Sequence, residues 1–220
     1  MVPGAILSQF NGDGQINDIE QMINTSNWST KVTYVNHHLA HAASTYLQSP
    51  YDEAAILTLD GRGEEDTSTF NHGFKKEITK LSSVKMPHSM GLFYASITDF
   101  LGFKPNTDEW KVMALASYGK QQNNPFYDKL RGLLETTETG GFEQDLTYFS
   151  YYSFDRQPHM YSEKMIDLLG PARKPDDPFD ARAKDIAAAL QMVFTDIADH
   201  LLHALHQKTG SDNLWLAGGA

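Results

Sequence analysis

AAILTLDGRGE, residues 54–64, is the stretch that most strongly indicates the fold. It begins with a short apolar run, which predicts a buried strand over residues 54–60. The glycine-rich DGRG that follows is typical of a turn and predicts that the strand ends at Asp60. Asp60 would then lie at the carboxyl end of a strand, where α/β sheets usually bind ligands.

Outward from this strand, hydrophobic periodicity and turn residues predict strands alternating with helices. The expected strands are 31–35, 67–74, 78–84 and 213–220, and the expected helices are 16–26, 37–48, 89–102, 107–119, 125–135 and 180–209. Residues 139–159, which are aromatic and polar, predict an irregular β-hairpin or an insertion. This alternation indicates an α/β or mixed α+β domain.

The composition excludes several classes of protein. The chain has 220 residues, of which 40% are hydrophobic, enough to build a core. Its formal net charge of -10 repels phosphates, so we expect no nucleic-acid partner. The lack of cysteine excludes disulfides and thiolate catalysis. Because the sequence offers no signal peptide and no membrane-spanning run, we expect a cytoplasmic protein without a membrane partner.

Three histidines cluster in VNHHLAHAAST, residues 35–45. On a helix, His37 and His41 share one face and could bind one metal ion, whereas His38 is turned away by about 100°. Asp60 is the expected third ligand, if the two segments are neighbours. Two histidines and one carboxylate suit iron, manganese or zinc. Alternatively, the histidines are surface or packing residues, since the glutamate of a metalloprotease HExxH motif is absent.

Each of the other candidate residues has both a ligand-binding and a purely structural interpretation. Gly61 and Gly63 would let the backbone approach a phosphate or substrate, or they form an ordinary hairpin turn. Gly218 and Gly219, which follow the last expected strand, raise the same pair of interpretations. Lys111 is either a phosphate-binding cation or a solvated lysine beside an apolar stripe.

Together, the motifs resemble one family. VNHHLAHAAST, LTLDGRGE, SMGLFYASITDFLGF, DEWKVMALASYG and LWLAGGA occur in the order and approximate spacing of the O-carbamoyltransferases, enzymes of nodulation and antibiotic tailoring. The resemblance covers most of residues 31–119 and the last residues of the chain. It implies an actin-like (ASKHA or RNase H-like) α/β domain with a mixed sheet and flanking helices, of which residues 1–220 are an expected part, incomplete at both ends.

The resemblance also implies an activity. In this family, a second, adenylate-forming domain makes carbamoyl-adenylate from ATP and carbamoyl phosphate, and the actin-like domain transfers the carbamoyl group to a hydroxyl of a sugar-like acceptor. By motif, His37, His41 and Asp60 hold a divalent metal. The expected cofactor contacts are Gly61, Gly63, Glu64, Lys111, Gly218 and Gly219. The expected partners are a small-molecule hydroxyl acceptor and a second copy of the chain in a homodimer.

The chain departs from the family in two ways. The His-Asp segment that would supply a general base is missing, and the adenylate-forming domain is absent. We therefore expect a fragment that is inactive alone. The alternatives are a non-catalytic nucleotide- or metal-binding domain of the same fold, or a homologue in tRNA threonylcarbamoyl transfer or hydrogenase maturation. Hydrogenase-maturation relatives carry cysteine zinc fingers, which this chain lacks.

Overall fold

The computed structural model describes residues 33–153 and 157–220 of the chain. Contacts divide the chain into two units between Val35 and Asn36. Residues 33–35 form no regular element, so the expectation of a strand was wrong for them. Residues 31–32 and the expected helix 16–26 lie outside the described residues. The account that follows concerns the unit that begins at Asn36.

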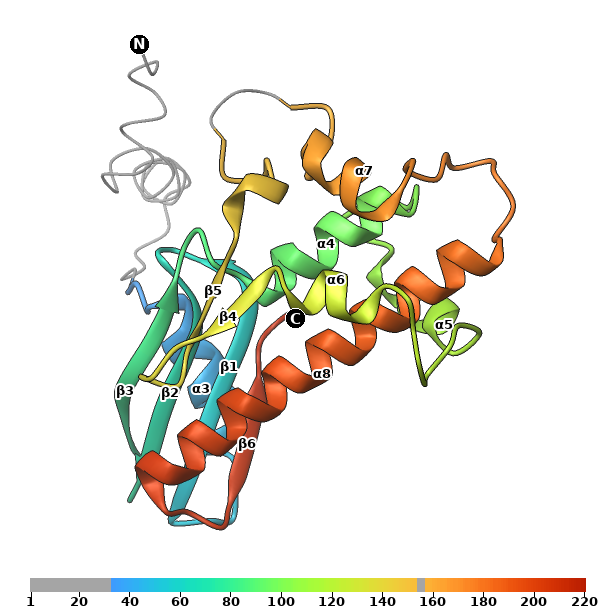
Figure 1. The fold of residues 1–220 in the computed structure, drawn as a ribbon. Helices are drawn as coiled ribbons and strands as arrows, with labels where there is room; N and C mark the ends of the chain where they lie inside the picture. Colours follow the sequence, from blue (N-terminus) through green and yellow to red (C-terminus); the bar gives the residue numbers. More distant parts are fainter. Residues whose placement is uncertain (1–32, 154–156) are drawn as a thin grey trace, which may run out of the picture. The chain divides into compact units, whose positions relative to one another are not determined.

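A four-stranded mixed sheet forms the centre of this unit (Figure 1). Its strands are β1 (Glu53–Gly63), β2 (Asp66–Phe74), β3 (Glu77–Lys85) and β6 (Leu214–Ala217), in the order β3-β2-β1-β6. The first three form an antiparallel meander, and β6 pairs with β1 in parallel. The mixed α/β class expected from the sequence is therefore confirmed.

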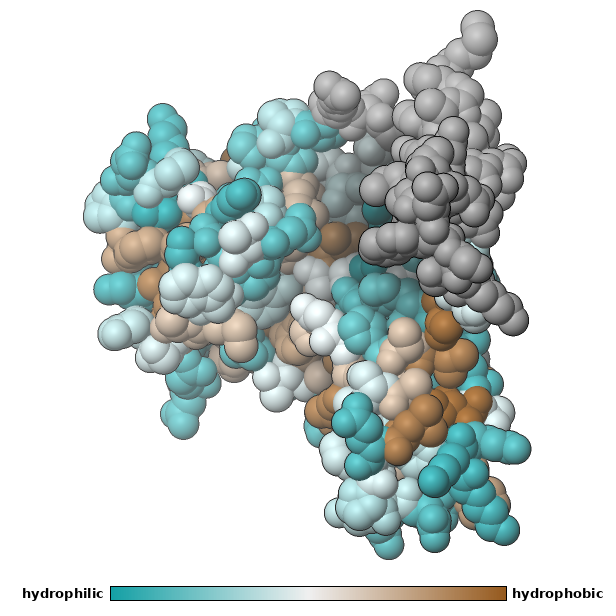
Figure 2. All heavy atoms as spheres, turned by 180° about the vertical axis from the view of Figure 1, so that it is seen from behind, coloured by the Kyte–Doolittle hydropathy of each residue, from teal (hydrophilic) through white to brown (hydrophobic). Residues whose placement is uncertain are grey.

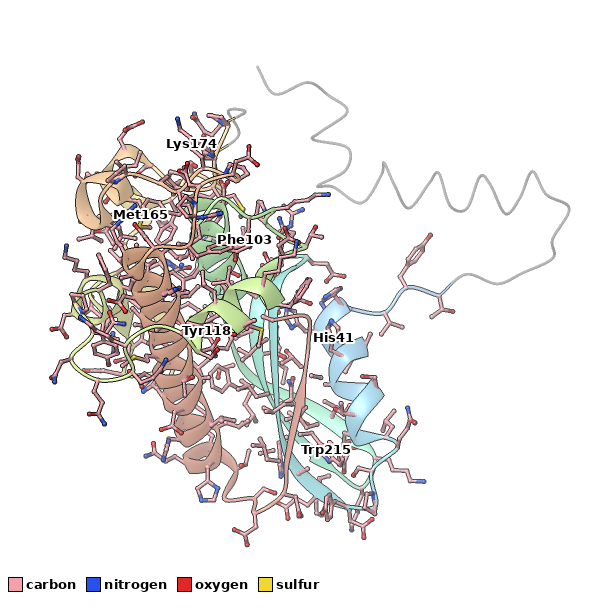
Figure 3. The ribbon with its side chains drawn as sticks, turned by 90° about the vertical axis from the view of Figure 1, so that its right-hand side faces the viewer. His41, Phe103, Tyr118, Met165, Lys174 and Trp215 are labelled. Carbon is pink, nitrogen blue, oxygen red and sulfur yellow. The ribbon has the colours of Figure 1, made fainter. Side chains whose placement is uncertain are left out.

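Two helices cover opposite faces of the sheet, α3 (His37–Tyr46) on one and α8 (Ala181–Thr209) on the other (Figure 3). Successive side chains of a strand point to opposite faces. Accordingly, Ala54 and Ile56 of β1 pack in the cluster that includes α3 residues, while Ala55 and Leu57 pack in the cluster that includes α8. This alternation turns the even-numbered positions of β1, including Asp60, toward α3.

The turn after β1 lies later than the sequence indicated. β1 continues through Asp60 to Gly63, with an irregularity in its pairing between Leu59 and Gly63. The chain reverses at Glu64, which has a φ of 57°, and β2 begins at Asp66. The expected end of the strand at Asp60 was therefore wrong, because residues 60–63 still belong to the ladder.

Smaller elements lie between β3 and α8 along the chain. They are α4 (Met90–Phe100), α5 (Glu109–Ala116), α6 (Tyr127–Arg131), β4 (Leu134–Thr136), β5 (Phe142–Gln144), the 3₁₀ helix η1 (Leu146–Tyr148) and α7 (Glu163–Leu169). The helix expected over 125–135 ends early, since its last residues enter β4. In the described part of 139–159, β5 pairs with β4, η1 follows it, and Phe149 forms an isolated antiparallel bridge with Tyr161, so the segment is not one hairpin. The sequence did not predict α7.

The long helix α8 has the ends and the apolar stripe that the sequence predicts. Asp180 caps its start by accepting a hydrogen bond from the Ala183 N–H at 2.7 Å, and Gly210 ends it with a φ of 64°. The stripe is fully buried and comprises Ile186, Leu190, Val193, Ile197, Leu201 and Leu205. Among the described residues, no helix combines the length and the apolar character needed to cross a membrane.

The outer side of α3 is partly apolar. Leu39 and Leu47 are exposed on it. Figure 2, which views the molecule from behind, shows apolar side chains gathered on the face that carries this helix. The inner side of α3 buries His38, Ala42 and Tyr46 against the sheet, so the helix is anchored along its length.

Candidate metal centre

Three side chains from α3 and β1 converge at one point. The Nε2 atoms of His37 and His41 lie 2.7 Å and 3.0 Å from Oδ2 of Asp60, and 3.1 Å from each other. The four-residue spacing puts both imidazoles on one face of α3, and the alternation of β1 turns Asp60 toward them. Figure 3 shows His41 at one end of the α3 face and Trp215 near the other.

The donor set fits a transition-metal ion. A metal bound to nitrogen and oxygen at about 2.1 Å separates adjacent ligand atoms by roughly 3.0 Å when its bond angles are near 90°. The three observed separations are close to this value. Two histidines and one carboxylate on one face of a metal leave its other positions open. The side chains of His37, His41 and Asp60 are 42%, 31% and 18% exposed, so a further ligand has access.

Asp60 is held in its ionised form. Its Oδ1 accepts a hydrogen bond from the Gly61 N–H at 2.7 Å, which leaves Oδ2 for the histidines. Burial by itself raises the pKa of Asp60, but hydrogen bonds from His37, the Gly61 N–H and His41 outweigh it and lower the pKa below its ordinary value. An ionised carboxylate is the form that binds a cation.

His38 is buried in the sheet interface and is only 1% exposed. Its Nδ1 lies 2.6 Å from Thr58 Oγ1, and its Nε2 lies 3.0 Å from the carbonyl oxygen of Asp66. Burial lowers its pKa, and the hydrogen bond to Asp66 offsets this only in part. His38 therefore does not reach solvent and belongs to the core between α3 and the sheet.

Gly63 and Glu64 lie close to the start of α3. A Cβ atom on Gly63 would lie 2.4 Å from His37 Cδ2 and 2.9 Å from His38 Cδ2, so this glycine leaves room for the two rings. The carboxylate of Glu64 accepts a hydrogen bond of 2.5 Å from Asn36, the residue that caps α3. Both residues thus contribute to the placement of α3 beside β1.

A cavity of about 420 Å³ lies beside Asp60. Its walls include the predicted residues Asp60, Gly61 and Gly219, and also residues that the sequence did not single out: Gly91, Tyr94, Asn106, Glu109, Met113, Gln191, Phe194 and Ala220. The sequence does indicate one of them, Gly91, because a glycine in the first turn of a helix often marks a close approach between two backbone segments. A Cβ atom on Gly91 would lie 2.7 Å from the backbone of Gly61.

The two remaining predicted residues, Gly218 and Lys111, lie in different surroundings. Gly218 has a φ of 124°, and its Cβ position overlaps the carbonyl oxygen of Leu59, so this glycine allows the end of β6 to lie against β1. Lys111 pairs with Asp108 at 2.8 Å and is not among the residues that line the cavity. Its helix contributes Glu109 and Met113 to the cavity instead.

Tyr94 and Gln191 are two polar residues that line this cavity and bond to each other. The Tyr94 hydroxyl donates to Gln191 Oε1 at 3.0 Å. Burial raises the pKa of Tyr94, so its hydroxyl stays protonated at neutral pH. The cavity therefore combines neutral hydrogen-bonding groups with two carboxylates, those of Asp60 and Glu109.

Comparison with known proteins identifies the family. The family described as "Carbamoyltransferase N-terminus" matches residues 16–220. The uncharacterised protein sll1178 of Synechocystis is 38% identical over 184 residues, which are 83% of this chain and 29% of that protein. The nodulation protein NolNO of Sinorhizobium fredii is 30% identical over 197 residues, 86% of this chain and 26% of that protein.

The nodulation protein NolO of Bradyrhizobium diazoefficiens is 29% identical over 192 residues, 84% of this chain and 31% of that protein. The chain thus spans less than a third of the length of each of these relatives. The family match, in contrast, extends over all of the described residues. The chain therefore belongs to the carbamoyltransferase family and corresponds to its N-terminal region.

Proposed function

We propose that this chain supplies the metal-binding part of a carbamoyl-transfer site. In the proposed reaction, the carbamoyl group passes from carbamoyl-adenylate to a hydroxyl of a sugar-like or other small acceptor. The observation that carries the proposal is the convergence of two imidazoles and one carboxylate, 2.7–3.1 Å apart, beside a cavity. Membership of the carbamoyltransferase family supports carbamoyl transfer in general, and the adenylate donor and the hydroxyl acceptor are part of the proposal.

The proposed chemistry balances without a redox partner. The acceptor oxygen forms a bond to the carbamoyl carbon, the bond from that carbon to the phosphate oxygen breaks, and AMP leaves with the bonding electrons. The acceptor proton passes to a base that is not assigned among the described residues. A divalent metal held by His37, His41 and Asp60 would stabilise negative charge that develops on the mixed anhydride.

The chain's own residues have distinct parts in this proposal. Asp60 and the two histidines hold the cation. Gly61, Gly91 and Gly219 leave the cavity wall without side chains, so an adenylate can approach the backbone closely. The Gly61 N–H is already bonded to Asp60, so it orients that carboxylate and is not a free phosphate donor.

The test uses the full-length product of the gene that encodes this chain. The protein is incubated with ATP, ¹⁴C-labelled carbamoyl phosphate and a panel of simple sugars and polyols, and label in neutral products is counted. Metal content is measured on the same samples. We expect His41→Ala and Asp60→Asn to lose bound metal and to lower transfer on the order of 100-fold, as when one stabilising group is removed from a developing charge.

His203→Ala is the matched control, because His203 lies on α8 with a side chain that is 72% exposed. It should keep both metal and transfer. Unchanged metal content and transfer in the two site variants would show that the site assignment is wrong. A wild-type protein that binds metal and adenylate without any transfer would instead indicate a non-catalytic binding domain.

A further inference from the structure

His38 is a buried titratable residue to which the proposed reaction gives no part. The Asp66 carbonyl oxygen can only accept, so His38 Nε2 donates to it across 3.0 Å. In a neutral imidazole the other nitrogen is an acceptor. Thr58 Oγ1 therefore donates to His38 Nδ1 across 2.6 Å. Both ring nitrogens are used, which excludes His38 as a metal ligand in this arrangement.

The same direction of donation continues across the sheet. The hydroxyl hydrogen of Thr58 is used in its hydrogen bond to His38. Thr58 Oγ1 therefore acts as the acceptor for the Thr69 hydroxyl at 2.7 Å and for the Thr69 N–H at 3.2 Å. Thr69 Oγ1 in turn accepts from Asn71 Nδ2 at 2.7 Å. Asn71, Thr69, Thr58 and His38 are all buried. A buried network that is satisfied in one proton arrangement holds its members rigidly.

This network joins the two elements that supply the proposed metal ligands. His38 is next to His37 on α3, and Thr58 is two residues before Asp60 on β1. Two strand residues span only about 6.6 Å. The hydrogen bond from Thr58 to His38 therefore fixes the separation of α3 and β1 close to the ligands on both elements.

Gly63 sets how closely α3 can approach β1. The His37 and His38 rings pack so closely on this glycine that a Cβ atom there would lie 2.4 Å and 2.9 Å from them. The helix is thus tied to the sheet by a hydrogen bond and stopped by direct packing on the backbone. Both constraints act within the first turn of α3.

We propose that His38 is a positioning residue, which sets the separation of α3 from β1 so that His37, His41 and Asp60 present their donor atoms to one metal ion. This inference rests on the proposed metal site and adds to it a residue that does not touch the metal. Outer-shell partners of this kind typically change metal affinity about 10–100-fold when they are removed.

The experiment measures Co²⁺ binding by calorimetry and visible absorption in the full-length protein. Thr58→Val removes the hydroxyl that bonds His38 and leaves α3 unaltered, whereas Thr58→Ser keeps the hydroxyl. His38→Gln removes the ring itself. Each titration is done at a temperature at which circular dichroism shows the metal-free variant to be folded.

Tyr46→Phe is the matched control for stability. Tyr46 lies on the same helix, is 2% exposed, and donates from its hydroxyl to the Asp52 carbonyl oxygen at 2.8 Å, at the end of α3 away from the ligands. Loss of the hydroxyl removes this bond and the one it accepts from the Lys76 N–H at 3.4 Å, and keeps the ring. We expect it to lower the melting temperature without changing Co²⁺ affinity.

We expect Thr58→Val and His38→Gln to weaken Co²⁺ binding about 10–100-fold and Thr58→Ser to restore most of it. Equal Co²⁺ affinity in folded Thr58→Val and wild-type protein would overturn the positioning role, even if stability had fallen. If His38→Gln does not fold, Thr58→Val decides. A wild-type protein that binds no Co²⁺, or an Asp60→Asn variant that binds it normally, would overturn the metal site itself.

Discussion

Asp66 is a buried carboxylate at the start of β2, and it is only 2% exposed. Its Oδ2 accepts a hydrogen bond from the Lys80 ammonium at 2.8 Å. Burial raises the pKa of Asp66, but the hydrogen bonds of Lys80 and Ser83 and the charge of Lys80 outweigh burial and lower the pKa below its ordinary value. The Asp66 carbonyl oxygen also anchors His38, so this residue bonds Lys80 through its side chain and the candidate site through its backbone.

A carboxyl group whose pKa is depressed by folding stabilises the protein above its unfolded pKa, about 3.9, and loses this contribution as the pH falls through the folded pKa. We therefore expect the wild-type free energy of unfolding to fall more between pH 7 and pH 3 than that of Asp66→Asn. Urea denaturation at the two pH values measures this difference. An equal fall in both proteins would contradict the assignment.

The sequence could predict that the candidate ligands converge, but not which residues hold them in place. The spacing of His37 and His41, and the position of Asp60 after an apolar run, follow from local patterns. The partners of His38 do not, because Thr58 and Asp66 meet it only through the pairing of β1 with β2. Such contacts depend on strand register, which a single sequence does not specify.

At the scale of elements, capping residues define α8. Asp180 satisfies the Ala183 N–H at the start of the helix. We expect Asp180→Ala to lower the free energy of unfolding by about 1 kcal/mol, and Asp180→Ser to keep most of it, since serine is also a good cap. Urea denaturation of the three proteins measures the effect. A loss shared equally by the alanine and serine variants would point to a role other than capping.

Elements with strong local signals were predicted, and those decided by tertiary contacts were not. The apolar stripe and caps of α8 gave its limits closely. The glycines of DGRG suggested an early turn, but pairing with β2 and close packing against α3 and α4 keep residues 60–63 in β1. The seven-residue helix α7 is too short to show a periodic pattern.

At the scale of the whole unit, α8 contacts both the sheet and the smaller helices. Near its start, Asp185 accepts from the Lys120 N–H, and its carbonyl oxygen accepts from Asn124. Near its end, Lys208 donates to Ser82 of β3 and to the Thr139 carbonyl oxygen. The mixed architecture could be predicted from alternating elements, whereas the actin-like assignment stays a prediction.

Leu190 is fully buried in the half of α8 that faces the smaller helices. We expect Leu190→Ala to lower the free energy of unfolding by about 2–5 kcal/mol. Because α8 is shared, hydrogen exchange should show lower protection in β1 as well as in α5. Thr195→Ala, an exposed substitution on the same helix, is the control. Lower protection confined to α5 would show that the two regions unfold separately.

Because the side chains of β1 alternate between the two faces of the sheet, inserting or deleting one residue in this strand has a predictable effect. Ala54, Ile56 and Asp60 share one side of the strand, while Ala55 and Leu57 share the other. Deleting one residue between Ile56 and Asp60 would turn the carboxylate away from the histidines. Homologues that gain or lose single residues should therefore do so at the turn after Gly63. A change there leaves the buried side chains of β1 and the candidate ligand Asp60 on the same faces of the sheet.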